Sequence, residues 1–157
     1  DSMLARIADL AGDWEMTDQD GKTHHAATFA VTAAGSAVRE IMFPGSESEM
    51  TNLYHMDGNE LVITHYCAAG NQPRMVASEA VDTDEGTVFL FEFDRVSNLR
   101  ESHDHYMGNM TLTILAPDRV RAKWRSYDRA GQLTDPIYFL MTRKIDEGDA
   151  IHPTRDK

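Results

Sequence analysis

The sequence predicts an all-β fold, a single antiparallel up-and-down β-barrel of about ten strands that follows a short N-terminal helical turn. Short segments of strand-like composition follow one another along most of the chain, and turn residues separate them at regular spacing. Because nearly all connections are short, consecutive strands should be antiparallel neighbours. A sandwich would share this pattern, but closure into a barrel removes exposed sheet edges, and we therefore favour the barrel.

The elements are expected in a simple order. Apolar residues at helical spacing predict the opening turn, namely Met3, Leu4, Ile7 and Leu10. The strand segments expected after it are 12–18, 23–33, 36–43, 49–56, 60–68, 73–82, 86–95, 106–115, 118–128 and 136–144. The one long polar connection between them is the stretch 96–104.

The turns between these segments are defined by glycine and asparagine, which accept the positive φ that tight hairpins require. They are Ala34-Gly35, Asp57-Gly58-Asn59, Ala69-Gly70-Asn71, Glu85-Gly86 and Ala130-Gly131. Ala116-Pro117-Asp118 fits a turn with proline at its second position, where the fixed φ suits the bend.

The composition indicates one globular domain over residues 1–146, followed by a polar tail over 147–157. Of the 157 residues, 41% are hydrophobic and 26% are charged, and no apolar run is long enough for a membrane helix. The net charge of −11 would repel nucleic acids and anionic membranes, so neither is expected as a partner. Cys67 is the only cysteine, which excludes an intrachain disulfide. The opening residues lack the pattern of a signal peptide.

Two groups of motifs carry a family resemblance. Leu10-Ala11-Gly12-Asp13-Trp14 resembles the Leu-x-Gly-x-Trp signature that opens lipocalin-like (calycin) barrels. The run 64–75 (THYCAAGNQPRM) and the segment from His103-Asp104-His105 to 118–124 (DRVRAKW) are similar to a bacterial lipocalin-like family of uncharacterised proteins. The resemblance covers about 10–144. It implies a barrel, a bacterial cytoplasmic or periplasmic location and no particular activity.

The same resemblance implies a structural role for Trp14. In such barrels a tryptophan on the first strand closes the narrow end beneath a basic residue from a late strand, and Arg143 is the candidate for that residue. Burial, and not ligand contact, is the expected role of this aromatic ring.

Alternation sets the orientation of the strand 118–128. Arg119, Arg121, Lys123 and Arg125 occupy every second position and should face water, which turns Trp124 inward between small Ala122 and Ser126. The space beside Trp124 is either a ligand pocket or is filled from across the barrel. On 86–95 the inward row is expected to be Phe89, Phe91 and Phe93, whereas alternation selects no face for 136–144, which contains Phe139.

The histidines suggest a metal site. A two-residue turn at Gly58-Asn59 would place His65 opposite Asn52 on the face of Tyr54, with His55 on the other face. A three-residue turn through Asp57 would instead place His65 on the same face as His55, and the sequence does not decide between the two turns. His103 and His105 would share a face, and with His65 they could bind zinc, copper or haem. The alternative is a pair of hydrogen-bonded residues at the rim. His24 and His25 are adjacent, hence on opposite faces, and are set aside.

Other chemistry finds little support. Cys67 lies two residues from His65, but a buried structural cysteine is expected in preference to a nucleophile. No nucleophile elbow, phosphate-binding loop, zinc-protease helix or dinucleotide fingerprint is present, so a non-enzymatic protein is favoured. Arg74, with Asn71 and Gln72, could receive a ligand carboxylate at the barrel mouth. The alternative is a turn whose side chains hydrogen-bond to its own backbone, with Arg74 paired to Glu79 or a neighbouring acid.

Three functional hypotheses follow. The first is a barrel that binds a small, largely apolar molecule in its lumen through Tyr54, His65, Arg74, His105, Trp124 and Phe139. The second is a metal or haem site, and hence a metalloenzyme or sensor, formed by His65, His103 and His105. The third is an assembly module, a homo-oligomer that associates through an apolar outer face of 136–144.

Overall fold

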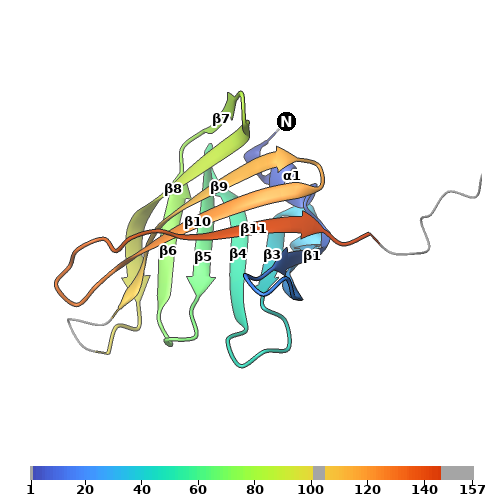
Figure 1. The fold of residues 1–157 in the computed structure, drawn as a ribbon. Helices are drawn as coiled ribbons and strands as arrows, with labels where there is room; N and C mark the ends of the chain where they lie inside the picture. The colour runs from blue at the N-terminus through green and yellow to red at the C-terminus, as the bar shows by residue number, and fades with distance from the viewer. Residues whose placement is uncertain (1, 101–104, 146–157) are drawn as a thin grey trace, which may run out of the picture.

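The computed structural model describes residues 2–100 and 105–145 and has the predicted all-β architecture with one short N-terminal helix (Figure 1). The helix is α1 (Met3–Ala8), and a single 3-10 turn follows the second strand at Ala33–Gly35. The strands are β1 (Gly12–Thr17), β2 (Thr23–Thr32), β3 (Ala37–Met42), β4 (Met50–Asp57), β5 (Glu60–Tyr66), β6 (Gln72–Ala77), β7 (Ala80–Thr83), β8 (Gly86–Ser97), β9 (Tyr106–Ala116), β10 (Arg119–Tyr127) and β11 (Ile137–Arg143).

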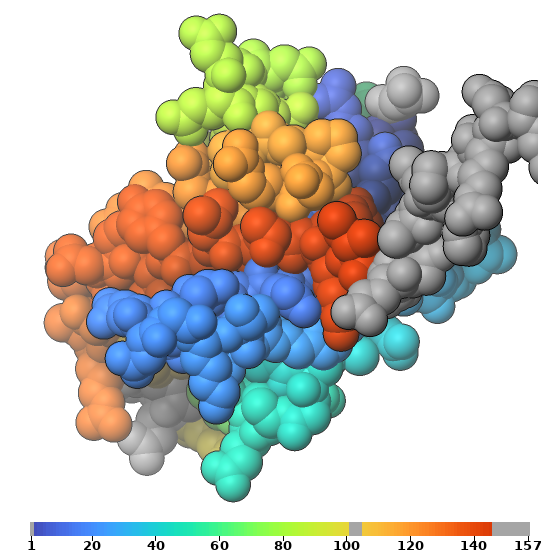
Figure 2. Space-filling model, turned by 45° about the vertical axis from the view of Figure 1, so that its right-hand side comes forward, coloured from blue at the N-terminus to red at the C-terminus, as the bar shows by residue number. Residues whose placement is uncertain are grey.

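Ten of these strands form a closed antiparallel barrel, which confirms the predicted fold. Sequential neighbours pair from β1 to β6 and from β8 to β11, β1 pairs with β11, and β6 pairs with β8 to complete the ring. In the space-filling view of Figure 2, the red band of β11 lies directly against the blue β1–β2 segment. Of the strands in the described residues, closure leaves only β7 outside the ring.

The prediction of one strand over 73–82 was wrong, because this segment is split. β6 ends at Ala77, and β7 begins at Ala80 and pairs only with β8. β8 is long enough to serve both partners, with its Gly86–Phe89 half on β7 and its Glu92–Ser97 half on β6. The β7–β8 hairpin therefore projects beyond the barrel wall, at the top of Figure 1.

One end of the barrel, which we call the closed end, contains α1 and the short turns after β4, β7 and β9. Ser2 caps α1 by accepting a hydrogen bond from the Ala5 N–H at 3.2 Å, and Leu4 and Ile7 are buried beneath the helix. Trp14 is fully buried, and the Arg143 guanidinium lies 4.6 Å from the centre of its ring. The predicted Trp14 plug with Arg143 above it is confirmed.

The opposite end, which we call the mouth, carries the longer connections. These are the loops 18–22, 43–49, 67–71 and 128–136, together with the connection between β8 and β9. The loop 43–49 contains Phe43, whose side chain borders a cavity in the lumen.

The barrel interior is packed by alternate side chains from every wall. On β10 the buried residues are Val120, Ala122, Trp124 and Ser126, which confirms the orientation predicted from the basic row. Phe89 and Phe91 are buried on β8, as predicted, and Phe93 is partly exposed. On β11 the inward residues are Phe139 and Met141. The other face of β11 exposes Tyr138 and Leu140, and Ile137 is also exposed, at the first position of the strand.

Candidate functional site in the lumen

A row of polar side chains crosses three neighbouring strands inside the barrel. Glu40 on β3 is the register partner of Asn52 on β4, and Asn52 is the partner of His65 on β5. All three are buried, at 5%, 0% and 1% exposure, among otherwise apolar neighbours. Asp57 pairs with Glu60, so the turn between β4 and β5 has two residues, Gly58 and Asn59. Of the two turn lengths considered from the sequence, the two-residue turn is therefore correct, and it places His65 opposite Asn52.

Hydrogen bonds give this row a defined direction. The Asn52 amide nitrogen donates to Glu40 Oε2 at 2.8 Å, so the Asn52 amide oxygen faces His65 Nδ1, 2.7 Å away. An amide oxygen only accepts, and His65 Nδ1 therefore carries the proton. Burial lowers the pKa of His65 to about 4, which keeps the ring neutral at pH 7.

The other ring nitrogen of His65 is consequently an unused acceptor. Nε2 is buried and has no hydrogen-bond partner in the part of the chain that the structure describes. The neutral ring places a lone pair there, since its single proton is on Nδ1. A buried polar atom without a partner is uncommon in a native protein and needs a physical explanation.

Glu40 is the acidic end of the row. Tyr54 donates to Glu40 Oε2 at 2.6 Å, so both hydrogen bonds to the carboxylate reach the same oxygen, and none within residues 2–100 and 105–145 reaches Oε1. No Lys, Arg or His among these residues forms an ion pair with Glu40. Burial raises the pKa of Glu40, and burial together with the Glu40 charge raises the pKa of Tyr54 well above its ordinary value.

Trp124 meets the polar row from the opposite wall. Its ring centre lies 5.0 Å from that of His65. Trp124, but not His65, borders a small cavity of about 10 Å³, room for one water molecule at most. Its walls are Ala26, Glu40, Met42, Phe43, Ala122, Trp124, Phe139 and Met141. The question of an open or filled lumen thus has an intermediate answer: the lumen is largely filled by buried side chains, and a small space lies beside Glu40.

Phe43 separates this cavity from the solvent at the mouth. It packs edge-on against Phe139 at 5.6 Å between ring centres, and it also borders an outer pocket of about 530 Å³. Its φ of +49° is a left-handed conformation that an aromatic residue rarely adopts. Strain of this kind costs about 1–3 kcal/mol and is concentrated at functional sites. The outer pocket is lined by Met16, His24, His25, Phe43, Pro44, Gly45, Ser46 and Ser48.

The structure brings four of the predicted site residues together. His65 is part of the polar row, Tyr54 donates to Glu40 of that row, and Trp124 and Phe139 line the cavity. Two others lie elsewhere. Arg74 is on the opposite face of β6 from buried Met75, where its guanidinium contacts Asp57 and Asp94. His105 is exposed, and its Nε2 bonds Ser126 Oγ at 2.9 Å.

The metal site stays a prediction. His103 lies outside the described residues, and residues 2–100 and 105–145 contain no group of three histidine, cysteine or acidic side chains placed to bind a metal ion. The prediction of a buried Cys67 was wrong. This free thiol is half-buried in the turn after β5, because the strand ends at Tyr66.

Sequence reasoning missed Glu40, Asn52 and Phe43 as site residues. The signal for Glu40 was present. Val38, Glu40 and Met42 occupy every second position of β3, so Glu40 shares the buried face of the strand with two apolar residues. His24 and His25 were set aside by alternation, yet both line the outer pocket. Next to them, Trp14 pairs with Ala27 and Glu15 with His25, which makes Ala26 the extra residue of a β-bulge.

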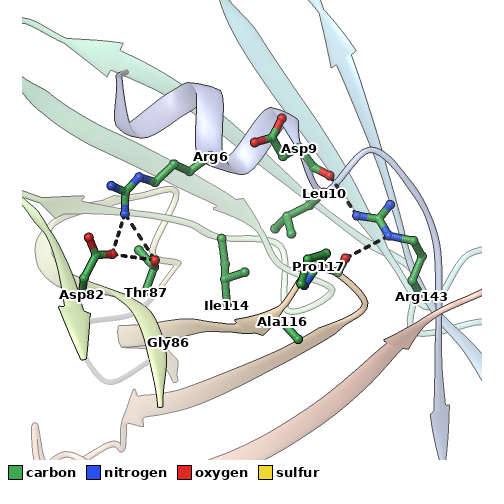
Figure 3. Close-up of a pocket in the computed structure, with 10 residues that line it drawn as sticks. All are labelled: Arg6, Asp9, Leu10, Asp82, Gly86, Thr87, Ile114, Ala116, Pro117 and Arg143. Atoms are coloured by element: carbon green, nitrogen blue, oxygen red, sulfur yellow. Dashed lines mark hydrogen bonds and ion pairs between the residues drawn. The ribbon is translucent and has the colours of Figure 1, made fainter. Parts of the chain in front are cut away.

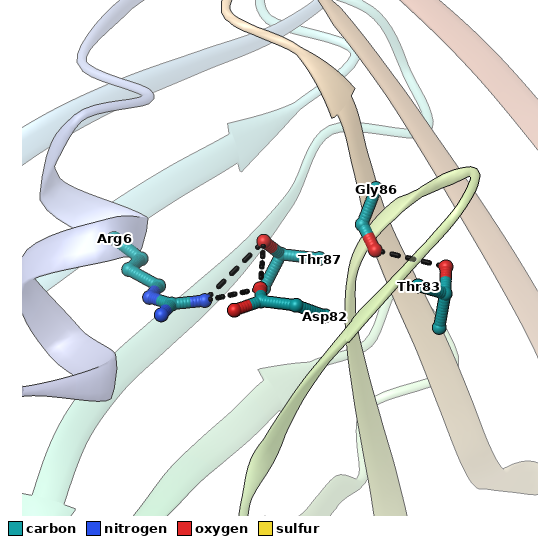
Figure 4. Close-up of polar contacts among 5 residues, drawn as sticks. All are labelled: Arg6, Asp82, Thr83, Gly86 and Thr87. Carbon is teal, nitrogen blue, oxygen red and sulfur yellow. Dashed lines mark hydrogen bonds and ion pairs between the residues drawn. The ribbon is translucent and has the colours of Figure 1, made fainter.

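A second pocket, of about 430 Å³, lies at the closed end between α1 and the β7–β8 hairpin (Figure 3). Arg6, Asp82 and Arg143, three of its charged residues, already have partners. Arg143 donates to the carbonyls of Asp9, Ala11 and Pro117. Arg6 donates to Asp82 at 2.8 Å and to Thr87 at 3.3 Å, and Thr87 donates to Asp82 (Figure 4). These groups fasten the helix to the barrel and leave little for a ligand.

Comparison with known proteins gives no family assignment. No protein-family model matches the chain, and no curated protein matches it. Among the described residues no helix is long and apolar enough to cross a membrane. The function must therefore be argued from the site.

Proposed function

We propose that the protein is a lipocalin-like barrel that binds a small molecule in the half of its lumen nearest the mouth. The observation that carries the proposal is the buried lone pair of His65 Nε2, which has no partner among the described residues although the other side of the ring is held by Asn52. A structural histidine would use both ring nitrogens or expose one. A ligand that donates a hydrogen bond supplies the missing partner.

Two further features support this position. Trp124 and Phe139 provide apolar walls around a break in the packing inside this half of the barrel. Phe43 closes that break from the mouth in a strained conformation, and its movement would join the inner cavity to the outer pocket. Small-molecule sites commonly combine apolar walls with a few placed polar groups in this way.

Native mass spectrometry tests the proposal. Protein purified under mild conditions, and protein mixed with a panel of small alcohols, amines, carboxylic acids and aromatic compounds, should show a compound bound one to one. The variant His65→Leu keeps the side-chain bulk but removes the lone pair, and it should bind at least about tenfold more weakly. Tyr66→Phe, on the exposed face of the same strand, is the matched control and should bind normally.

The outcome that would refute the proposal is equally specific. A panel from which nothing binds one to one, or a compound whose affinity is the same in His65→Leu, would leave the polar row as a purely structural network. Association through the exposed β11 face stays a separate prediction, and light scattering of the purified protein over a concentration series tests it.

A further inference from the structure

We infer that the ligand is an amine, bound as its ammonium form at the Glu40 carboxylate. This inference rests on the proposed function and specifies the chemical class of the ligand. Glu40 is 5% exposed and lines the inner cavity, yet no cationic side chain of the described residues pairs with it. Buried carboxylates in proteins are normally paired with a cation, because an isolated buried charge is costly.

The atoms left for a ligand are all acceptors. Glu40 Oε1 receives no hydrogen bond from residues 2–100 and 105–145, because Asn52 and Tyr54 both donate to Oε2. His65 Nε2 presents a lone pair. A ligand that satisfies these atoms must donate, and an ammonium group has three N–H donors and no acceptor. A carboxylate ligand would instead place two like charges together inside the barrel.

The cavity walls suit the same group. Phe43, Trp124 and Phe139 bring three aromatic rings to the cavity, and the electron-rich face of an aromatic ring attracts a cation. Met42 and Met141 add polarizable sulfur. The formal charge of −11 on the whole chain favours the approach of a cation over that of an anion.

Size decides where the rest of the ligand lies. The free volume of about 10 Å³ holds a group the size of water, and an ammonium group is of that size. The carbon body must therefore extend past Phe43 into the outer pocket of about 530 Å³. A primary amine on an unbranched chain meets both conditions.

Three probes with one chain length test the inference: hexylammonium, hexan-1-ol and hexanoate, titrated at pH 7 against the full chain by two-dimensional NMR. Hexylammonium should bind most tightly, with chemical-shift changes at Glu40, His65 and Trp124. In Glu40→Gln, which keeps the shape and an acceptor for Tyr54 and Asn52, its affinity should fall about tenfold to hundredfold. Hexan-1-ol should bind this variant as it binds the wild type.

Arg39→Gln provides the matched control, because Arg39 is the exposed neighbour of Glu40 on the opposite face of β3. Equal or tighter binding of hexan-1-ol or hexanoate would overturn the inference of an amine but leave lumen binding in place. Hexylammonium binding that is unchanged in Glu40→Gln would also overturn it. Failure of all three probes to bind, together with failure of the wider panel, would overturn both proposals.

Discussion

The closed end and the mouth-side half of the lumen differ in how their polar groups are satisfied. At the closed end Arg143 donates three hydrogen bonds to backbone carbonyls and covers Trp14, and the Trp14 N–H donates to the Leu10 carbonyl at 2.8 Å. In the mouth-side half, His65 Nε2 and Asn71 Oδ1 are the two buried side-chain atoms without a partner among the described residues, and Glu40 has no cation beside it.

This difference separates two tasks within one barrel. Satisfied groups contribute to stability and leave nothing for a ligand, whereas an unsatisfied buried group lowers stability unless something binds it. The closed end should therefore respond to substitution through the free energy of unfolding, and the mouth-side half through ligand binding and pH. The predictions below test this division, beginning with the largest expected effect.

Replacing Trp14 with alanine should cost about 3–5 kcal/mol of unfolding free energy, because it removes a fully buried ring and leaves a cavity beneath Arg143. Urea unfolding followed by circular dichroism measures this loss. Trp14→Phe retains an aromatic ring and should lose clearly less. A loss below about 1 kcal/mol in Trp14→Ala would contradict the assignment of the closed end as the structural half.

Stability should depend on pH through His65. Its pKa is about 4 in the folded protein and about 6.5 when unfolded, so the unfolded chain binds more protons between these values. Acidification from pH 6.5 to pH 4 should therefore remove about 3 kcal/mol of stability, and His65→Gln should lack this contribution.

Glu40 complicates that measurement in a known direction. Burial raises its pKa, so above its ordinary value of 4.5 the folded state holds a proton that the unfolded state has lost, and stability decreases as pH rises through this range. The informative quantity is the difference between wild type and His65→Gln at each pH, in which the Glu40 contribution largely cancels. A difference that does not change between pH 6.5 and pH 4 would mean that His65 is not held neutral by burial.

Arg143→Leu should cost about 2 kcal/mol, the sum expected for the lost hydrogen bonds to exposed carbonyls and the lost contact of the guanidinium with the Trp14 ring. Arg119→Leu, an exposed arginine at the same end of the barrel, is the control. Both variants should bind ligand like the wild type, and weakened binding in Arg143→Leu alone would show that the two halves are coupled.

The smallest effect is expected at the ion pair between α1 and the β7–β8 hairpin. Arg6 and Asp82 are exposed, and pairs of this kind contribute little once water and salt screen them (Figure 4). Arg6→Gln should leave the urea midpoint unchanged within error at 0.15 M salt. A loss as large as that of Arg143→Leu would show that these contacts stabilise the fold more than an exposed ion pair should.

The sequence was sufficient for the barrel because turns and alternation are local signals. The glycines of the predicted turns, Gly35, Gly58, Gly70, Gly86 and Gly131, all adopt positive φ. Trp124 was oriented correctly because basic residues alternate with it along β10. The split between β6 and β7 was missed because it depends on β8 changing partners, which is a tertiary property that no local pattern records.

The site was predictable only in part, for a related reason. His65 and Trp124 were selected from their own strands, but their contact across the lumen depends on barrel closure. Arg74 was read as a mouth residue from the neighbouring turn, whereas its partners Asp57 and Asp94 come from other strands. The free acceptor on His65 could not be inferred without the hydrogen bond from Nδ1 to Asn52.

The chain contains two tryptophans, one in each half of the lumen, and this allows the most direct test of where a ligand binds. Protein labelled with 5-fluorotryptophan should give two fluorine NMR signals, assigned with Trp14→Phe and Trp124→Phe. Titration with hexylammonium, and with any compound that co-purifies, should shift the Trp124 signal and leave the Trp14 signal in place. A shift confined to Trp14, or one-to-one binding that moves neither signal, would contradict a ligand site in the mouth-side half.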